Sequence, residues 1–180
     1  MRSFLTKKIL KDVKNIWEGT WECSLGEGVN WQDIYRSLGN TPQQYRAIRY
    51  KILTRTVGTN SFLNKIELRE TDSCDHCMLW ENIEHKFWYC QRVRTFWENL
   101  DEWLTRNYQT PSKGGDRITE VILGGTASQI INHIISVGLY MIYSGKQLSL
   151  ETLEGILQAD CKSEKYWAQL NNKMACFEST

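Results

Sequence analysis

The chain has 180 residues, of which 41% are hydrophobic and 24% are charged, and its formal net charge at pH 7 is +1. These proportions are typical of a globular protein and exclude an intrinsically disordered chain. Because the total charge is nearly neutral, it gives no evidence for a polyanionic partner. Any such evidence must come from how the charges are distributed along the chain. The length is sufficient for one substantial hydrophobic core or two small ones.

Residues 3–18 predict an amphipathic helix with a basic back. The lysines interrupt what would be the continuous apolar region of a secretory signal, so we expect an intracellular protein of the nucleus and cytoplasm that is not secreted. A mitochondrial presequence is the weaker interpretation, because lysine dominates over arginine and Asp12 intrudes. Residues 19–30 are interpreted as a loop, which gives an N-terminal region of residues 1–29. The apolar positions are Phe4, Leu5, Ile9, Val13, Ile16 and Trp17, and the basic positions are Lys7, Lys8, Lys11 and Lys14.

Two further helices are predicted before residue 56. Asn30 is expected to cap a short helix that ends near Gly39. A third helix is expected to follow, with Thr41 as its N-cap and Pro42 at its first position, where the missing N–H of proline costs nothing.

The third helix lies in the only sizeable field of one charge sign. Between Asp33 and Glu67 there are basic residues and no acidic ones. Such a surface neutralises phosphates, and Tyr45 and Tyr50 are candidates for stacking on bases of a single strand. The alternative is a solvated helix face with tyrosines in the core, and the sequence leaves both open. The basic residues of this field are Arg36, Arg46, Arg49, Lys51, Arg55 and Lys65.

Between residues 74 and 90 the chain carries a C-x2-C-x7-H-x4-C pattern formed by Cys74, Cys77, His85 and Cys90. Three thiols and one imidazole make a complete tetrahedral ligand set for a structural Zn²⁺, so we predict one zinc ion per chain. The alternative is three unrelated buried cysteines and a surface histidine, because free cysteine often behaves as a small hydrophobe. His76 is ranked below His85 as a ligand and is interpreted as a solvated loop residue.

The spacing of the second ligand pair makes a specific structural prediction. His85 and Cys90 are five residues apart, which on a regular helix separates their side chains by about 140°. We therefore predict that the helix breaks between them: a short turn capped by Asn82 runs through His85 to Phe87, and a new amphipathic helix starts just after Cys90. The fold is expected to be mainly α: a small helical domain around the Cys3His zinc loop, residues 30–108, followed by a C-terminal helical segment.

Beyond the zinc loop, residues 109–117 are rich in turn formers and predict a linker. The C-terminal region, residues 118–180, predicts a long apolar helix capped by Ser128 that reaches about Lys146, and a last helix capped by Ser149. The apolar stretch of the first is too short for a membrane span of about 20 residues, so we expect a buried helix and no membrane association. His133 is interpreted as a core histidine. The cysteines outside the zinc loop, Cys23, Cys161 and Cys176, argue against a disulfide framework.

The stretch from Arg49 to Cys77, followed by I-E-H-K-F-W-Y-C-Q-R-V-R-T-F-W-E-N-L, resembles the zinc-binding region at the C-terminal end of LINE-type (non-LTR) retrotransposon reverse transcriptases. The resemblance covers roughly residues 30–175 and is strongest from Tyr50 to Leu100. It implies that Cys74, Cys77, His85 and Cys90 are the family's CCHC ligands and that Trp88 and Trp97 occupy its aromatic positions. It also implies a role in holding element RNA or target DNA. One departure is Gln91, which stands where the family usually has proline.

The sequence carries no paired-aspartate polymerase motif and no endonuclease constellation, so we expect this chain not to be an enzyme by itself. The leading hypothesis is a non-catalytic zinc- and nucleic-acid-binding module of, or fragment derived from, such a reverse transcriptase. Its partners would be RNA or DNA and the upstream polymerase domain, with no small-molecule substrate. Rival hypotheses are a protein-interaction domain in which zinc is purely structural, an enzyme using Cys90 or His133, and a decayed element. The predicted phosphate contacts are Arg46, Arg49, Lys51, Arg55, Lys86, Arg92 and Arg94.

Overall fold

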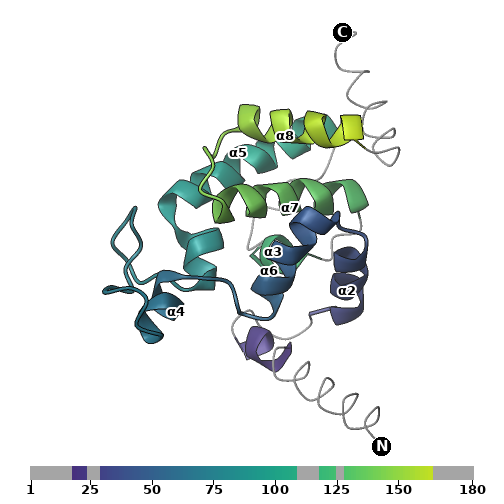
Figure 1. The fold of residues 1–180 in the computed structure, drawn as a ribbon. Helices are drawn as coiled ribbons and strands as arrows, with labels where there is room; N and C mark the ends of the chain where they lie inside the picture. The colour runs from purple at the N-terminus through teal and green to yellow at the C-terminus, as the bar shows by residue number, and fades with distance from the viewer. Residues whose placement is uncertain (1–17, 24–28, 109–117, 125–127, 164–180) are drawn as a thin grey trace, which may run out of the picture.

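The computed structural model describes residues 18–23, 29–108, 118–124 and 128–163, and within them the chain is mainly helical, as predicted (Figure 1). Most of the predicted amphipathic helix 3–18, the linker 109–117 and the chain beyond residue 163 lie outside the described residues. Residues 18–23 form one short helical piece. The named elements are α2 (Trp31–Gly39), α3 (Gln43–Leu53), α4 (Asn60–Lys65), the π-helical turn η1 (His85–Tyr89), α5 (Gln91–Tyr108), α6 (Ile118–Ile122), α7 (Gln129–Tyr143) and α8 (Leu150–Ser163).

Helix α7 lies at the centre of the fold, between α3 and α8, and also contacts η1 (Figure 1). Its predicted burial is confirmed: eleven of its 15 residues are buried. Ser128 caps it as predicted, but it ends at Tyr143, earlier than the expected Lys146. No helix in the described part of the chain is long and apolar enough to cross a bilayer.

One hydrophobic core joins the regions that the sequence separates. It includes Trp21 near the N-terminus, Phe87 of η1 and Leu157 of α8, each no more than 1% exposed. The residues on the two sides of the predicted linker therefore share their buried surface. By contrast, α4 and the loop that follows it project from one side of this helical body (Figure 1).

The helix start signals are mostly confirmed. Asn30 accepts a hydrogen bond from the backbone N–H of Asp33 at 3.3 Å, and Ser149 accepts one from that of Thr152 at 3.1 Å. The predicted Thr41 cap is wrong. Pro42 occupies the cap position without a side-chain cap, and the Thr41 hydroxyl instead donates to the Ser37 carbonyl at 2.8 Å, an acceptor at the end of α2 that the helix itself leaves unpaired.

The predicted loop from residue 19 to residue 30 is also wrong at its start, because residues 18–23 are helical. Trp21 explains this order. Its ring is fully buried, and its Nε1–H donates to the carbonyl of Leu53 at 2.8 Å. The indole thus fixes this helical turn to the end of α3.

A buried arginine ties α3 to the segment before α7. Arg49 is 3% exposed, and its guanidinium donates to the carbonyl of Leu123 at 2.7 Å. Burial lowers the pKa of Arg49 to about 10, because no opposite charge compensates the lost hydration. Gly124, at φ +82°, leaves the space that the guanidinium fills, since a Cβ there would lie 1.5 Å from Nη2. The remaining acceptors, all hydroxyl oxygens, belong to Ser37, Thr41 and Ser136.

A second polar cluster joins α3, α7 and α8 around Asp160. Its carboxylate accepts from the Tyr45 hydroxyl at 2.6 Å and from the Gln44 amide at 3.0 Å, and His133 Nε2 lies 3.2 Å away. Burial acts to raise the pKa of Asp160, but the hydrogen bonds from His133, Tyr45 and Gln44 together outweigh it and lower the pKa. His133 is therefore a buried core histidine, as predicted, and its pairing with an acid was not predicted.

Candidate metal centre

The predicted ligands Cys74, Cys77, His85 and Cys90 converge, with their four ligand atoms all within 4.8 Å of one another. The Sγ atoms of Cys74 and Cys90 are 3.8 Å apart, and Cys77 Sγ lies 3.2 Å from His85 Nε2. Around a tetrahedral Zn²⁺ with the usual bond lengths, the sulfur–sulfur edge is about 3.8 Å and the sulfur–nitrogen edge about 3.5 Å. The first separation matches, and the second requires a shift of a few tenths of an ångström. The alternative of unrelated cysteines is therefore wrong in its geometry.

A tight turn aims the first two sulfurs at one point. The backbone N–H of Met78 donates to the carbonyl of Cys74 at 2.9 Å, and that of Cys74 donates to the carbonyl of Leu79 at 2.7 Å. Met78 takes φ +61° at the point of reversal, a backbone conformation that costs a non-glycine residue about 1–2 kcal/mol. An antiparallel bridge between Ser73 and Trp80 closes the base of the turn.

The second ligand pair comes from a helical turn capped by Asn82, as predicted, but this turn continues to Tyr89 and not only to Phe87. The break expected between His85 and Cys90 is therefore wrong in position, because it lies at Cys90 itself. Asn82 accepts a hydrogen bond from the N–H of His85 at 2.7 Å, and Cys90, with ψ 128°, breaks the helix before α5 begins at Gln91. The π character of the turn was not predicted. The N–H of Cys90 donates to the carbonyl of His85 at 2.9 Å, five residues back, and this wider turn brings both side chains to one side.

Three of the four ligand side chains are buried, and Cys77 is partly buried. Cys74 and Cys90 are each 2% exposed and His85 is 6% exposed. Burial raises the pKa of the Cys74 thiol to about 11, although backbone N–H groups of His76 and Cys77 act to lower it. Burial also lowers the pKa of His85, which keeps the imidazole neutral and able to donate a lone pair. A divalent cation binds neutral imidazole and displaces thiol protons, so metal binding here would release protons.

Two buried acids fix the metal loop, residues 74–90, to the segments that precede it in the chain. Glu84 Oε1 accepts from Arg55 at 2.9 Å, and the Arg55 guanidinium lies over the ring of Trp21 at 4.3 Å. Glu81 Oε1 accepts from the N–H of Asn60 at 3.0 Å and lies 3.5 Å from Lys86 Nζ. Glu84 directly precedes His85 along the chain, and Glu81 lies four residues before it. Neither role was predicted from the sequence, in which the available signal was two acids shortly before a ligand.

The helix after the last ligand is attached by an indole. Trp97 Nε1–H donates to the carbonyl of Phe87 at 2.8 Å, and Phe87 is fully buried. This bond crosses the break at Cys90, so η1 and α5 are fixed to each other by more than the metal ligands. Trp88, the other aromatic position implied by the resemblance, is half-buried against the core.

The predicted phosphate contacts separate into two groups. Arg49 is buried, and Arg55 and Lys86 hold the metal loop, with Lys86 Nζ also donating to the Gly58 carbonyl at 2.8 Å. The structure therefore contradicts Arg49 as a surface contact, because all its hydrogen bonds point into the core. The exposed members are Arg46, Lys51, Arg92 and Arg94, the last two near the start of α5. The Arg46 guanidinium donates to the carbonyls of Gly39 and Thr41.

The two tyrosines proposed for base stacking also differ. Tyr45 is 2% exposed and donates to Asp160, so it belongs to the core. Tyr50 is 52% exposed and keeps its ring accessible. His76, ranked below His85, is exposed and stands outside the converging group.

Comparisons with protein-family models, with curated proteins and with solved structures found no match to this chain. Function is therefore inferred from the residues themselves and from the geometry of the candidate metal centre.

Proposed function

We propose that the chain is a non-catalytic zinc- and nucleic-acid-binding module of, or derived from, a non-LTR retrotransposon reverse transcriptase. The observation that carries the proposal is the convergence of Cys74, Cys77, His85 and Cys90. Three sulfurs and one nitrogen leave no open position for a substrate or a water, which is the donor set of a structural zinc site. Thiolate ligands also select zinc over magnesium or calcium.

The metal would connect the projecting loop to the first turn of α5. Arg92 and Arg94, two and four residues after Cys90, are exposed in the first turn of α5, so fixing Cys90 also fixes the helix turn that carries them. Arg46 and Lys51 are exposed on α3, in the acid-free stretch between Asp33 and Glu67. These four side chains are the proposed phosphate contacts.

A candidate base-stacking residue is the sequence neighbour of Lys51. Tyr50 is exposed next to Lys51, whose Nζ lies 3.3 Å from the hydroxyl of Tyr143. Exposed aromatic rings beside cations favour single-stranded nucleic acid, because any base can stack on the ring while the cation neutralises the backbone. In this proposal Arg49, Arg55 and Lys86 serve the fold and make no phosphate contact.

The metal is tested by elemental analysis of the purified chain. We expect one zinc per chain in the wild type and loss of zinc, together with the cooperative melting transition, in Cys74→Ser. Cys23→Ser is the matched control, because Cys23 is exposed and outside the converging group. Equal zinc content in the wild type and in Cys74→Ser would remove the basis of the proposal.

Nucleic-acid binding is tested with a mixed-sequence single-stranded RNA at several salt concentrations. Arg92→Gln combined with Arg94→Gln should weaken binding and flatten the dependence of log affinity on log salt by about 0.7 for each lost phosphate contact. The control is Arg106→Gln on the same helix. It is matched because each arginine lies near a glutamate four residues away, Arg94 near Glu98 and Arg106 near Glu102. RNA affinity that is independent of salt and of Arg92 and Arg94 would refute the proposed surface.

A protein-interaction domain is the second candidate function, favoured by one observation. The metal loop exposes large apolar side chains, including Leu79 at 63% and Trp80 at 59%. In that case zinc stabilises the loop and a protein covers it. Retained zinc without any RNA binding, together with a protein partner lost on Trp80→Ser, would favour this candidate.

A further inference from the structure

Large apolar side chains are concentrated on the metal loop and on the helix before it. We call them the exposed apolar set. Among the described residues, the other large hydrophobic side chains that are exposed are all tyrosines, whose hydroxyls tolerate water. A concentration of exposed aliphatic and indole surface marks a binding site. The set comprises Phe62 (39% exposed), Ile66 (45%), Leu68 (74%), Met78 (74%), Leu79 (63%) and Trp80 (59%).

The two chain segments that carry the set are fixed to each other. The backbone N–H of Ser61 donates to the carbonyl of Glu81 at 3.1 Å, and the Asn60 amide donates to the carbonyl of Ser73 at 2.7 Å. These bonds join the first turn of α4 to the base of the turn that carries Cys74 and Cys77. The set therefore stands on a preformed support, and binding to it costs little ordering of the backbone.

The surroundings of the exposed apolar set are acidic. Residues 62–80 contain four acidic and two basic residues, and one of the basic residues, Arg69, pairs with Asp75. A divalent metal bound by three thiolates would add one further negative charge. Such a surface repels nucleic acid and attracts a basic partner with an apolar side.

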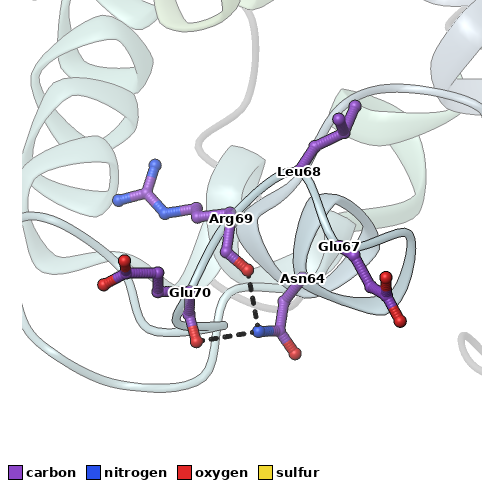
Figure 2. A pocket seen from close by; sticks show the side chains of 5 residues that line it. All are labelled: Asn64, Glu67, Leu68, Arg69 and Glu70. Carbon is purple, nitrogen blue, oxygen red and sulfur yellow. Dashed lines mark hydrogen bonds between the residues drawn. The ribbon is translucent and has the colours of Figure 1, made fainter.

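A shallow hollow of about 360 Å³ lies within this acidic segment. Its lining includes Glu67 and Glu70, and Figure 2 shows the Asn64 amide donating to the carbonyls of Arg69 and Glu70, at 3.0 Å each, which closes the chain around it. Leu68, a member of the exposed apolar set, also lines the hollow. Carboxylates and apolar surface are thus adjacent, as the recognition of a lysine side chain requires.

The chain itself contains a segment of the complementary chemistry. Residues 3–17 carry seven apolar residues, six of them assigned above to one side of the predicted helix, and four lysines against one aspartate. As a helix they would extend about 22 Å, enough to cover several side chains of the set. We infer that residues 3–17 dock as a basic amphipathic helix on the exposed apolar set of the same chain.

The attachment point of this segment lies close to the metal loop. Trp21, in the helical turn that follows it, lies against Arg55, and Arg55 pairs with Glu84 beside the ligand His85. A segment that starts from this turn begins its path next to the loop it would cover. The docking is independent of nucleic-acid binding, because Arg46, Lys51, Arg92 and Arg94 are outside the exposed apolar set.

Photo-crosslinking of the full chain tests the inference. A benzophenone amino acid replaces Leu79, the protein is irradiated, and the crosslinked peptides are identified by mass spectrometry. We expect crosslinks to residues 3–17 within a monomer, with a yield that does not depend on protein concentration. The same amino acid in place of Tyr143, which is 37% exposed on α7, is the control and should give no crosslink to this segment.

Hydrogen exchange supplies a second readout. In the full chain, Leu79→Ser combined with Trp80→Ser should cause loss of amide protection in residues 3–17, whereas Tyr50→Ser should not. Both changes replace exposed side chains, and zinc content and melting temperature confirm that each variant folds. Crosslinked dimers would overturn the inference in favour of a second copy. Absent crosslinks to residues 3–17, or unchanged exchange in the double variant, would overturn it in favour of another occupant of the set.

Discussion

The close approach of α5 side chains to Gly138 of α7 gives the most quantitative prediction. Gly138 lies in the middle of α7, and a Cβ built on it would meet the Trp97 ring at 2.7 Å and Phe96 Cε1 at 3.2 Å. Gly155, on α8, has nothing within 4 Å of the same atom. The substitutions Gly138→Ala and Gly155→Ala therefore add the same methyl group to two helices, one into a filled core and one into solvent.

The expected magnitudes follow from two terms. Replacing glycine by alanine inside a helix stabilises by about 0.8–1 kcal/mol, and this term is common to both variants. Inserting a methyl group into a well-packed core costs about 1–3 kcal/mol. Trp97 cannot swing aside freely, because its Nε1–H donates to the buried carbonyl of Phe87 at 2.8 Å. Gly155→Ala should therefore raise the free energy of unfolding. The free energy of unfolding of Gly138→Ala should be lower than that of Gly155→Ala by about 1–3 kcal/mol.

The assay is urea unfolding at saturating zinc, followed by far-ultraviolet circular dichroism. For a chain of this length each kcal/mol corresponds to about 2–4 °C in melting temperature, so a thermal scan checks the same difference. Equal stabilities for the two alanine variants would refute the reasoning. They would mean that the Trp97 ring moves at no cost and that α7 does not pack against α5 as described.

Three further predictions concern the buried polar groups. Arg49→Met should lower the free energy of unfolding by about 1–3 kcal/mol, because it leaves the Leu123 carbonyl without its donor, yet it should not change the salt dependence of RNA binding. Glu84→Gln should destabilise by less than the about 3–5 kcal/mol of a fully buried pair, because Arg55 keeps some solvent contact, and elemental analysis should still find one zinc per chain. Asp160 has a pKa below its usual 3.8 in the folded protein, so its contribution to stability is present above that pH and is lost as the pH falls through the folded pKa. The stability difference between wild type and Asp160→Asn, measured by urea unfolding, should therefore be largest near pH 7 and shrink below about pH 4.

Each of these has an opposing result. A flattened salt dependence in folded Arg49→Met would return this residue to the RNA-binding surface. Loss of zinc from Glu84→Gln would make the Glu84 carboxylate part of the metal centre. A stability difference for Asp160→Asn that persists unchanged into acid would show that the hydrogen bonds to the carboxylate do not depend on its charge.

The metal ligands were predictable because their information is local. The spacing of Cys74, Cys77, His85 and Cys90 fixes the donor set, and the five-residue step between the last two correctly indicated that no regular α-helix joins them. The π turn could not be predicted, because it differs from an α turn only in that its backbone hydrogen bond spans five residues instead of four. The caps at Asn30, Ser128 and Ser149 were likewise local and are confirmed.

The role of Arg49 depends on residues far along the chain, which is why the sequence analysis misplaced it. Its guanidinium meets Leu123 and Ser136, 74 and 87 positions away, and no local pattern reveals such a partner. One signal was present. Arg49 stands beside Ile48 and three residues before Ile52, both buried, so it lies on the apolar side of α3. A cation at such a position needs hydrogen-bond acceptors inside the protein.

The distance along the chain between α3 and α7 also sets the order in which a newly made polypeptide assembles. During synthesis residues 74–90 leave the ribosome before residues 129–143 have been made, and closing this short loop costs less entropy than joining α3 to α7. We therefore expect the ion to load onto the nascent chain first. Until the last third of the protein emerges, the apolar side of α3 has nothing to cover it, so translation that stops before residue 129 should yield a metal-loaded product that aggregates.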